Sequence, residues 1–346
     1  MQKTITIALD MMSGDHGLES SVPAALKSLS KHQELNLILV GDKDKISKIL
    51  KDSDIKKYSG RLRINHTDEF IRMDDEVLNA IRYKKNSSMR LSINLVKDTT
   101  AHACVSAGNT GALMALSKII LKTMDGIDRP AICTALPTKN DLMHMLDLGA
   151  NIECSEKHLF QFAIMGSALV QSLEINDRPK IGLLNIGSEE FKGNEIIRNA
   201  SNLIDNSPLN YCGYVEGDDI FSGNYDVVVT DGFAGNIALK SIEGVANVIK
   251  HFIKGEFSRN ILTKFSALIC YPVMKAVKKK VDPRRYNGAS LLGLNGIVVK
   301  SHGGADSFAF HRAIETAYYE ARNNIQEKIR SYIAVSYTHL RCRRRG

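Results

Sequence analysis

The chain has 346 residues, of which 44% are hydrophobic and 24% charged, proportions that are ordinary for a soluble globular protein. This length can form one large α/β domain or two smaller ones, and no apolar run approaches the roughly 18 residues that span a bilayer. The net charge is +8, but without Arg341 and the arginines at 343–345 there remain 42 basic and 38 acidic residues, and a balance of +4 does not favour nucleic acid as a partner.

The predicted elements alternate along the chain between strands and helices. We expect strands at 3–9, 35–41, 61–66, 101–106, 130–136, 142–148, 180–185, 209–215, 225–230 and 295–300, of which 130–136 and 142–148 can pair with each other. We expect helices at 18–31, 43–51, 75–98 with a break near 86–88, 109 onward, 156–173, 193–204, 233 onward and 305–330. This alternation predicts an α/β fold, a mostly parallel sheet with helices on both faces. Without an internal repeat or a disordered linker, we expect one elaborated domain over residues 1–333.

The two ends of the chain differ in character. The first ten residues lead directly into a strand, so we expect no signal peptide. Residues 336–346 have no amphipathic period and end in an arginine cluster. This favours a cloning or read-through extension that covers residues 334–346; a genuine basic tail is the alternative. The cysteines show no paired metal-binding spacing and indicate reduced thiols in a cytoplasmic protein; they lie at 104, 133, 154, 212, 270 and 342.

Two short apolar runs, 181–194 and 226–236, break into glycines, carboxylates and an asparagine just before helical patterns. In open α/β sheets, ligands bind beyond the carboxyl ends of the strands, where such loops gather. Glycine lets backbone N–H groups approach an anion closely, and the following helix offers its positive N-terminal end. These loops are therefore expected to hold a small anion or a polarised carbonyl.

Lys192 and Asn236 are the candidates for chemistry in these two loops. Lys192 sits just before a helix, where a lysine can neutralise phosphate or stabilise an oxyanion. Asn236 ends a Gly-Phe-Ala-Gly run, where its amide can hold a carbonyl oxygen. The alternatives are a solvated surface lysine and a helix cap.

Three further loops follow strands. Residues 106–112 suit an anion cradle of backbone N–H groups and the hydroxyls of Ser106 and Thr110, or form an ordinary strand-to-helix turn. The loop at 10–17 carries Asp10 and Asp15, which could place amides, ligate a metal or cap the next helix. His302, after the last strand, could be an acid/base group or a structural histidine.

Neither a Gly-x-Ser-x-Gly motif nor a recognisable cysteine nucleophile motif is present. Dinucleotide and Walker phosphate-binding patterns are also missing. If the chemistry is acyl transfer, the nucleophile is expected to come from the substrate.

The ordered motifs of this chain resemble those of the bacterial phosphate acyltransferase family, known as PlsX, from Ile5 to about Ile329. The stretches that carry the resemblance are Asp10–Asp15, Asp74–Glu76, Lys84–Met89, Ser106–Ala112, Leu146–Asn151, His158–Gly166, Leu183–Gly187, Lys192–Asn194, Thr230–Asn236, Leu291–Gly296 and Ser301–Gly303. The chain departs from the family pattern at Ser13, where glycine is usual, and also at Val77 and Gly304.

The resemblance implies that inorganic phosphate attacks the thioester of a long-chain acyl-carrier protein. The products would be free carrier thiol and an acyl phosphate for phospholipid synthesis, which a membrane glycerol-3-phosphate acyltransferase would use next. It also implies a homodimer, no cofactor, no metal, and a fold similar to phosphotransacetylases and the isopropylmalate-dehydrogenase type.

Matching positions of the family motifs assign Lys192 and Asn236 to catalysis. The residues expected to bind substrate or phosphate are Asp10, Gly14, Asp15, Ser106, Gly108, Asn109, Thr110, Gly111, Asn185, Gly193, Asn194, Asp231, Gly232, Gly235 and His302.

The segment 257–280 mixes large apolar residues with lysines, which is typical of an interfacial contact with anionic lipid. A dimerisation or core helix pair with a solvated basic end is the alternative. The family, whose members associate peripherally with membrane through a helical hairpin, favours the lipid contact, and we expect a protruding hairpin at about 250–283. The residues expected to touch the membrane are Ile261, Leu262, Phe265, Leu268 and Ile269.

Two other classes of function remain open. An NAD-dependent decarboxylating dehydrogenase on a similar fold would need clustered metal-binding aspartates and an arginine-rich hydroxyacid site, which are not assembled in this sequence. A non-catalytic module that binds acyl carrier or lipid would not release carrier thiol in a phosphate-dependent way.

Overall fold

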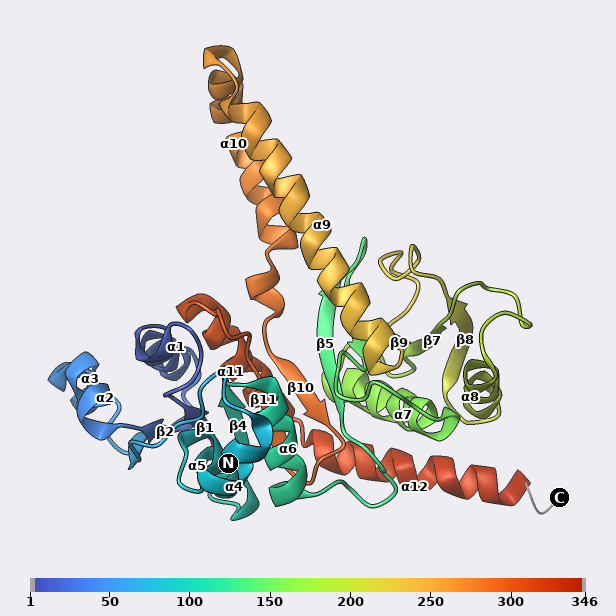
Figure 1. Ribbon diagram of the computed structural model, residues 1–346, viewed down its shortest axis with the longest axis horizontal. Coiled ribbons are helices and arrows are strands. Elements are labelled where there is room, and N and C mark those ends of the chain that lie inside the picture. Colours follow the sequence, from blue (N-terminus) through green and yellow to red (C-terminus); the bar gives the residue numbers. More distant parts are fainter. Residues whose placement is uncertain (1–3, 344–346) are drawn as a thin grey trace.

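The computed structural model describes the backbone of residues 4–343 and the side chains of residues 4–336. Within this part of the chain, eleven strands form one sheet in the order β3-β2-β1-β4-β11-β10-β5-β6-β9-β7-β8 (Figure 1). The strands are β1 (Ile5–Asp10), β2 (Leu35–Gly41), β3 (Leu62–His66), β4 (Ala103–Ser106), β5 (Ala131–Pro137), β6 (Leu142–Leu146), β7 (Lys180–Leu184), β8 (Asn210–Val215), β9 (Val227–Val229), β10 (Ala289–Leu292) and β11 (Ile297–Lys300). The expected α/β class is confirmed.

Most neighbouring strands pair in parallel, but the direction of the sheet reverses in its middle. The pairs β11–β10, β10–β5 and β5–β6 are antiparallel, and the last confirms the expected pairing of the two central strands. The strands β6, β9, β7 and β8 are therefore parallel to one another and antiparallel to the group β3, β2, β1, β4 and β11. Each group presents its own row of carboxyl ends.

Helices cover both faces of the sheet. They are α1 (Gly17–Lys31), α2 (Lys43–Ile49), α3 (Asp52–Lys57), α4 (Val77–Tyr83), α5 (Ser88–Lys97), α6 (Thr110–Leu121), α7 (Glu156–Ser172), α8 (Glu195–Asp205), α9 (Gly232–Ser258), α10 (Ile261–Val281), α11 (Ser307–Arg322) and α12 (Ile325–Arg343), with a 3-10 turn at Pro283–Tyr286. One core joins the sheet to α1, α7, α8, α11 and α12, and the other joins it to α4, α5, α6 and the base of α9. Within the described residues, no helix has the length and apolar character needed to cross a membrane.

The structure corrects several expected boundaries. The helix expected at 305–330 is two helices, because Asn324 adopts a positive φ of 51° between α11 and α12. The short strand β10 and the six-residue helix α3 were not expected, since each offers too few residues to show a period. The backbone of 334–343 continues α12; the side chains of 337–346 lie outside the described residues.

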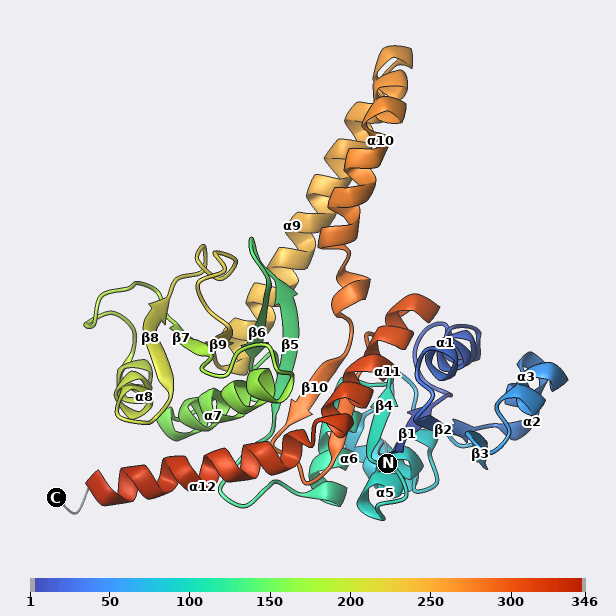
Figure 2. The same cartoon turned by 180° about the vertical axis from the view of Figure 1, so that it is seen from behind.

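The long helices α9 and α10 form a hairpin that projects from the sheet (Figures 1 and 2). Its two helices run from Gly232 to Val281, and Ala238 and Leu239 at the base of α9 pack against the core, so the projecting part begins beyond them and overlaps the expected hairpin at about 250–283. Only Gly232 and Gly235 of α9 are buried, and α10 has no buried residue among those described. The hairpin therefore adds little to the core of this chain.

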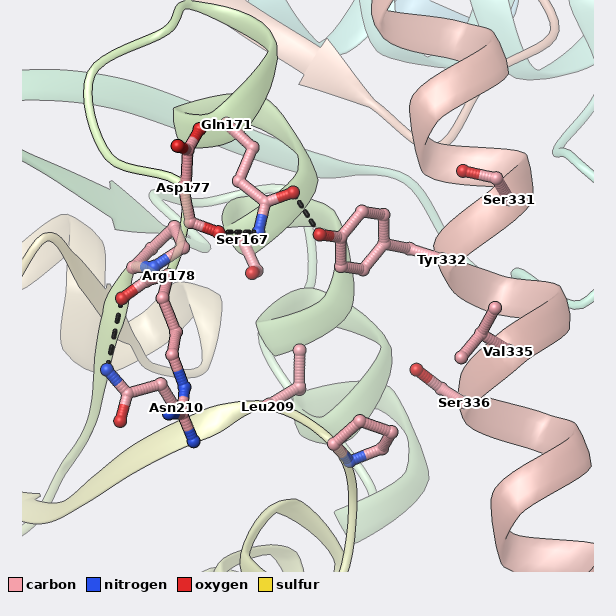
Figure 3. Close-up of a pocket in the computed structure, with 12 residues that line it drawn as sticks. Ser167, Gln171, Asp177, Arg178, Leu209, Asn210, Ser331, Tyr332, Val335 and Ser336 are labelled. Atoms are coloured by element: carbon pink, nitrogen blue, oxygen red, sulfur yellow. Dashed lines mark hydrogen bonds between the residues drawn. The ribbon is translucent and has the colours of Figure 1, made fainter.

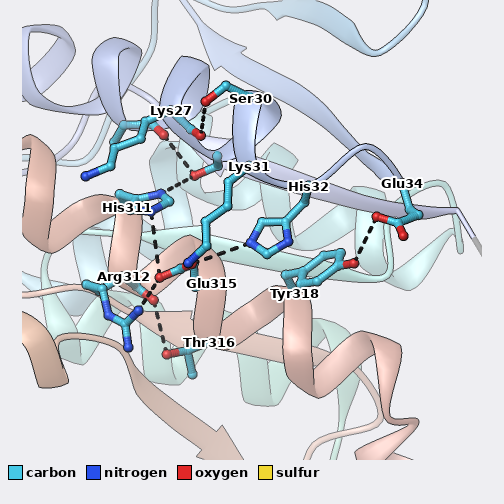
Figure 4. A network of polar contacts seen from close by, with 12 residues as sticks. Lys27, Ser30, Lys31, His32, Glu34, His311, Arg312, Glu315, Thr316 and Tyr318 are labelled. Carbon is cyan, nitrogen blue, oxygen red and sulfur yellow. Dashed lines mark hydrogen bonds and ion pairs between the residues drawn. The ribbon is translucent and has the colours of Figure 1, made fainter.

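A charged cluster fastens α1 to α11 (Figure 4). The Glu315 carboxylate is almost fully buried and accepts contacts from Lys31 and Arg312, with His32 Nε2 at 3.5 Å. His311 Nδ1 lies 2.7 Å from Ser28 Oγ on α1. Because α1 and α11 begin directly after the loops that follow β1 and β11, this packing helps to position those loops.

Candidate active site

The last residues of three adjacent parallel strands form a row at the first set of carboxyl ends. Asp10 ends β1, Ser106 ends β4 and Lys300 ends β11, and the register pairs Ser106 with Asp10 on one side and with Lys300 on the other. An acid, a hydroxyl and an ammonium group therefore lie side by side. We call Asp10, Ser13, Ser88, Ser106 and Lys300 the first centre.

Asp10 organises the first centre from below the surface. Its side chain is buried, and its two carboxylate oxygens accept hydrogen bonds of 2.6 Å from Ser88 Oγ and Ser106 Oγ. Burial raises the pKa of the Asp10 carboxyl, while the bonds from Ser106 and Ser88 act to lower it. Ser13 Oγ lies 3.3 Å from Ser106 Oγ, so this departure from the family pattern adds a hydroxyl to the same network. Asp10 can thus act on a ligand through hydroxyl groups.

Lys300 and Ser88 belong to this centre although the sequence did not single them out. Lys300 is 8% exposed, and its Nζ donates to Ser301 O at 2.6 Å and to Ala107 O at 3.2 Å. Burial lowers the pKa of the Lys300 ammonium to about 8, although the negative charges of Asp10 and Asp15 act to raise it. The available signal in the sequence was a lysine as the last residue of the apolar strand β11.

Close backbone packing holds the loops of the first centre together. Gly14 has a φ of +84°, and a Cβ there would lie 2.9 Å from Ala107 Cβ and 3.0 Å from Gly303 O. Asp15 N donates to Gly303 O at 2.9 Å. The loops after β1, β4 and β11 therefore meet at a point where only glycine fits.

Other expected residues of these loops have structural partners. Asn109 caps α6 through Ala112 N at 3.0 Å, and its Nδ2 donates to Met73 O. Thr110 and Gly111 form the first turn of α6. His302 Nδ1 accepts from Gly304 N at 3.1 Å, which agrees with the structural alternative for this histidine.

The second centre lies at the carboxyl ends of the adjacent parallel strands β6, β9 and β7, in the loops 147–151, 230–236 and 185–194. Asp147 locks the first of these loops: its buried carboxylate accepts from Ile132 N, Ala150 N, Asn151 N and Asn151 Nδ2 at 2.7–3.1 Å. Burial raises the pKa of the Asp147 carboxyl, although these hydrogen bonds lower it.

The first turn of α9 packs against the loop of Asp147. A Cβ on Gly235 would lie 2.0 Å from Asp147 O, and one on Gly232 would lie 2.6 Å from Asn151 O. Asn236 follows directly, and its side chain lies beside Gly149. Close packing therefore requires glycine at both positions, and it brings Asn236 to the 147–151 loop.

Helix caps account for two expected residues of the second centre and not for a third. Asp231 caps α9 through Ala234 N at 2.8 Å, and Asn194 caps α8 through Ile197 N at 2.9 Å. The capping alternative for Asn236 is wrong, because Asp231 holds that position. Asn185 Nδ2 donates to Gly187 O and Lys192 O, which shapes the loop that carries Lys192, and Gly193 packs against Asn185 with a φ of +84°.

Lys192 and Asn236 are half-buried and retain free donors. Among the hydrogen bonds and ion pairs of the described residues, none involves the Lys192 ammonium or the Asn236 side-chain amide. Lys192 Nζ lies only over the ring of Phe191, 5.8 Å from its centroid. Two polar groups on neighbouring loops are therefore available to a ligand.

The structure brings the expected residues together as two groups. No hydrogen bond between described residues joins the first centre to the second, and three antiparallel pairings separate them along the sheet. A cavity of about 410 Å³ lies elsewhere, between α7, α12 and the β7–β8 edge (Figure 3), and none of the expected residues lines it.

Comparison with known proteins identifies the family. The model of the family described as "Fatty acid synthesis protein" matches residues 5–328. The chain belongs to this family. It is 54% identical to the phosphate acyltransferase of Methylococcus capsulatus over 94% of this chain and 95% of that one, and 52% identical to that of Hydrogenovibrio crunogenus over 97% and 100%. The chain is an acyltransferase of the same kind, as the motifs indicated.

Solved structures support the fold. The phosphotransacetylase of Streptococcus pyogenes superimposes with a TM-score of 0.60 at 16% identity, covering 92% of this chain and 94% of that one. A branched-chain phosphotransacylase from Enterococcus faecalis gives 0.55 at 12% identity, covering 91% and 99%. A 4-hydroxythreonine-4-phosphate dehydrogenase from Klebsiella pneumoniae gives 0.51 at 14%, covering 93% and 99%. The expected resemblance to phosphotransacetylases is confirmed at the level of the fold.

Proposed function

We propose that this protein transfers a long-chain fatty acyl group from acyl-carrier protein to inorganic phosphate, giving an acyl phosphate for phospholipid synthesis. A phosphate oxygen attacks the thioester carbon, the carbon–sulfur bond breaks, and the carrier sulfur leaves with the electron pair and takes up a proton. The relatives named phosphate acyltransferase support this reaction.

The observation that carries the proposal is the pair of free donors Lys192 and Asn236. An ammonium group and an amide on adjacent loops suit the charge that develops on the thioester oxygen and on the attacking phosphate. We expect phosphate at the loops 10–17 or 106–112, where glycine-rich turns precede α1 and α6.

The buried cysteines Cys104 and Cys133 and the half-buried Cys154 favour a nucleophile that comes from the substrate. Burial raises the pKa of the Cys104, Cys133 and Cys154 thiols, that of Cys154 to about 12. These thiols stay protonated near neutral pH and are poor nucleophiles. Phosphate can fill that role instead.

The direct test incubates the purified chain with palmitoyl-carrier protein and phosphate. We expect an acyl phosphate by mass spectrometry and an equal amount of free carrier thiol. Omitting phosphate is the control, and thiol release that does not depend on phosphate would contradict the proposal. A requirement for a nicotinamide and a divalent metal would point instead to the dehydrogenase alternative.

We also propose that the hairpin binds reversibly to anionic membrane and that the chain works as a cytoplasmic homodimer. The five apolar side chains expected at the lipid lie on one face of α10 and are 62–84% exposed. Such a surface needs a lipid or protein partner. Release of an amphipathic acyl phosphate at the membrane would also favour its downstream user.

Sedimentation with anionic vesicles at low salt tests the membrane contact. Leu268→Glu should abolish co-sedimentation. Cys270→Glu is the matched control, because Cys270 is exposed on α10 and two residues turn the helix about 200°. Wild-type protein that stays in the supernatant, or a Leu268→Glu protein that becomes monomeric in sedimentation velocity, would favour a buried interface instead.

A further inference from the structure

We propose that Lys300 is a positioning residue of the phosphate site: it holds the β4 and β11 loops in register and supplies the fixed positive charge of the first centre. This inference rests on the proposed function and names a residue that the family motifs did not single out.

The position of Lys300 is the first support. It is in register with Ser106, and Ser106 is in register with Asp10, so its ammonium completes a row across three parallel strands. Its Nζ donates to Ala107 O, two residues before the cap of α6, and to Ser301 O at the start of the β11 loop. One side chain therefore joins the two loops that flank the α6 N-terminus.

The cost of burying this charge is the second support. Lys300 is 8% exposed, and the ion pairs among the described residues do not include it. A lysine is rarely buried without a charged partner, because desolvation disfavours its ammonium. The carbonyl contacts alone could be met by a neutral donor, and Asp10 and Asp15 act on Lys300 without forming an ion pair with it, so its positive charge remains available to an anion that binds nearby.

The groups that face Lys300 decide the pH dependence. Asp10 on β1 and Asp15 on the following loop act on it, and both favour the charged form. Cys104, also close to Asp10, has a raised pKa and stays protonated. Because burial lowers the pKa of Lys300 to about 8, its charge is present at neutral pH and is lost as the pH rises through that value.

The experiment separates the charge from the loop contacts. Lys300→Gln keeps a donor for the carbonyl oxygens but removes the charge, and Lys300→Met removes both. Lys97→Met, on the exposed end of α5, is the matched loss of charge. Thermal unfolding is followed with increasing inorganic phosphate and no acyl donor, with sulfate in parallel, and KM for phosphate is measured separately.

We expect both Lys300 variants to lose the phosphate-dependent rise in Tm and to raise KM for phosphate by roughly 10- to 100-fold, the range for a hydrogen bond to a charged group. KM for the acyl carrier should change little. In wild type, phosphate protection should fall above about pH 8, and this fall should be missing in Lys300→Gln.

A Lys300→Gln protein with unchanged phosphate protection would overturn the proposal. A lower Tm with an unchanged KM for phosphate would show a structural clamp only and overturn it as well. Binding is measured without acyl donor, so a wild-type chain that binds phosphate but makes no acyl phosphate would contradict the proposed function and leave this inference standing.

Discussion

The first and second centres occupy equivalent places, each at the carboxyl ends of three adjacent parallel strands, but they use their side chains differently. In the first centre, Asp10, Ser88, Ser106 and Lys300 bind one another or nearby carbonyls and are buried. In the second, Lys192 and Asn236 are half-buried and keep their donors free. The difference suggests a preorganised binding site in one case and reactive donors in the other.

The largest effect should come from removing the free donors of the second centre. We expect Lys192→Ala and Asn236→Ala each to lower turnover on the order of 100-fold or more, because a lost oxyanion donor costs about that much. Unfolding temperature should change little, since neither side chain has a hydrogen-bond partner among the described residues. Folded variants that keep near wild-type turnover would remove the distinction between the two centres.

The next effect concerns stability and should be larger in the first centre. Asp10→Ala leaves the Ser88 and Ser106 hydroxyls without their carboxylate partner and should lower the free energy of unfolding by about 2–3 kcal/mol. Asp231→Ala removes a helix cap and should cost about 1 kcal/mol. Urea unfolding of both variants measures these free energies. Equal losses would show that Asp10 contributes no more to stability than the helix cap Asp231 does.

The same contrast explains what could be predicted from the sequence. Strand and helix periods gave the α/β class, and the loops at Lys192 and Asn236 could be found because glycines, caps and helix starts are close together along the chain. The first centre joins Asp10 to Ser88 and Ser106, 78 and 96 residues away. Such contacts depend on strand order and register, which local patterns do not contain.

The reversal of the sheet was also beyond local pattern. β10 has four residues and forms antiparallel pairs with β11 and β5, yet it decides that the two halves run in opposite directions. A four-residue apolar segment is too short to distinguish a strand from a turn. The sequence predicted a mostly parallel sheet, but it did not predict the reversal that divides the loops into two groups.

A smaller effect should appear in the pH dependence of stability, through the cluster that positions the loops of the first centre. Burial lowers the pKa of His311 to about 4 and also lowers that of His32. In the unfolded chain these histidines bind a proton near pH 6.5, whereas in the folded chain they stay neutral to lower pH. Their contribution to stability therefore falls as the pH drops from about 6.5 to 4.

His311→Asn isolates that contribution, because other buried carboxyls such as Glu320 titrate in the same range with the opposite sign. Between pH 6.5 and 4, the free energy of unfolding should fall less steeply in the variant, by up to about 1.4 kcal/mol per pH unit. Denaturant unfolding at several pH values measures the slopes. Parallel curves would mean that His311 titrates normally in the folded chain.

The smallest effect should be electrostatic steering of an acidic carrier protein. Its measurement would show which centre the carrier approaches. Of the basic residues near the first centre, Lys84 pairs with Asp75 and Arg72 lies near Asp74, which leaves Arg82 and Lys85. At the base of the hairpin, Arg284 pairs with Asp282 and Asp306, whereas the lysines at 278–280 are exposed and have no ion pair among the described residues.

We therefore expect charge reversal at Lys279 and Lys280 to raise KM for the carrier several-fold, and reversal at Arg82 and Lys85 to raise it less. The effect in wild type should weaken above about 0.15 M salt, where the screening length is about 8 Å. KM for phosphate serves as the internal control, because a small anion is not held by distant lysines. A carrier KM that ignores salt would exclude steering, and a larger effect from Arg82 and Lys85 would place the approach of the carrier beside the first centre instead of the hairpin.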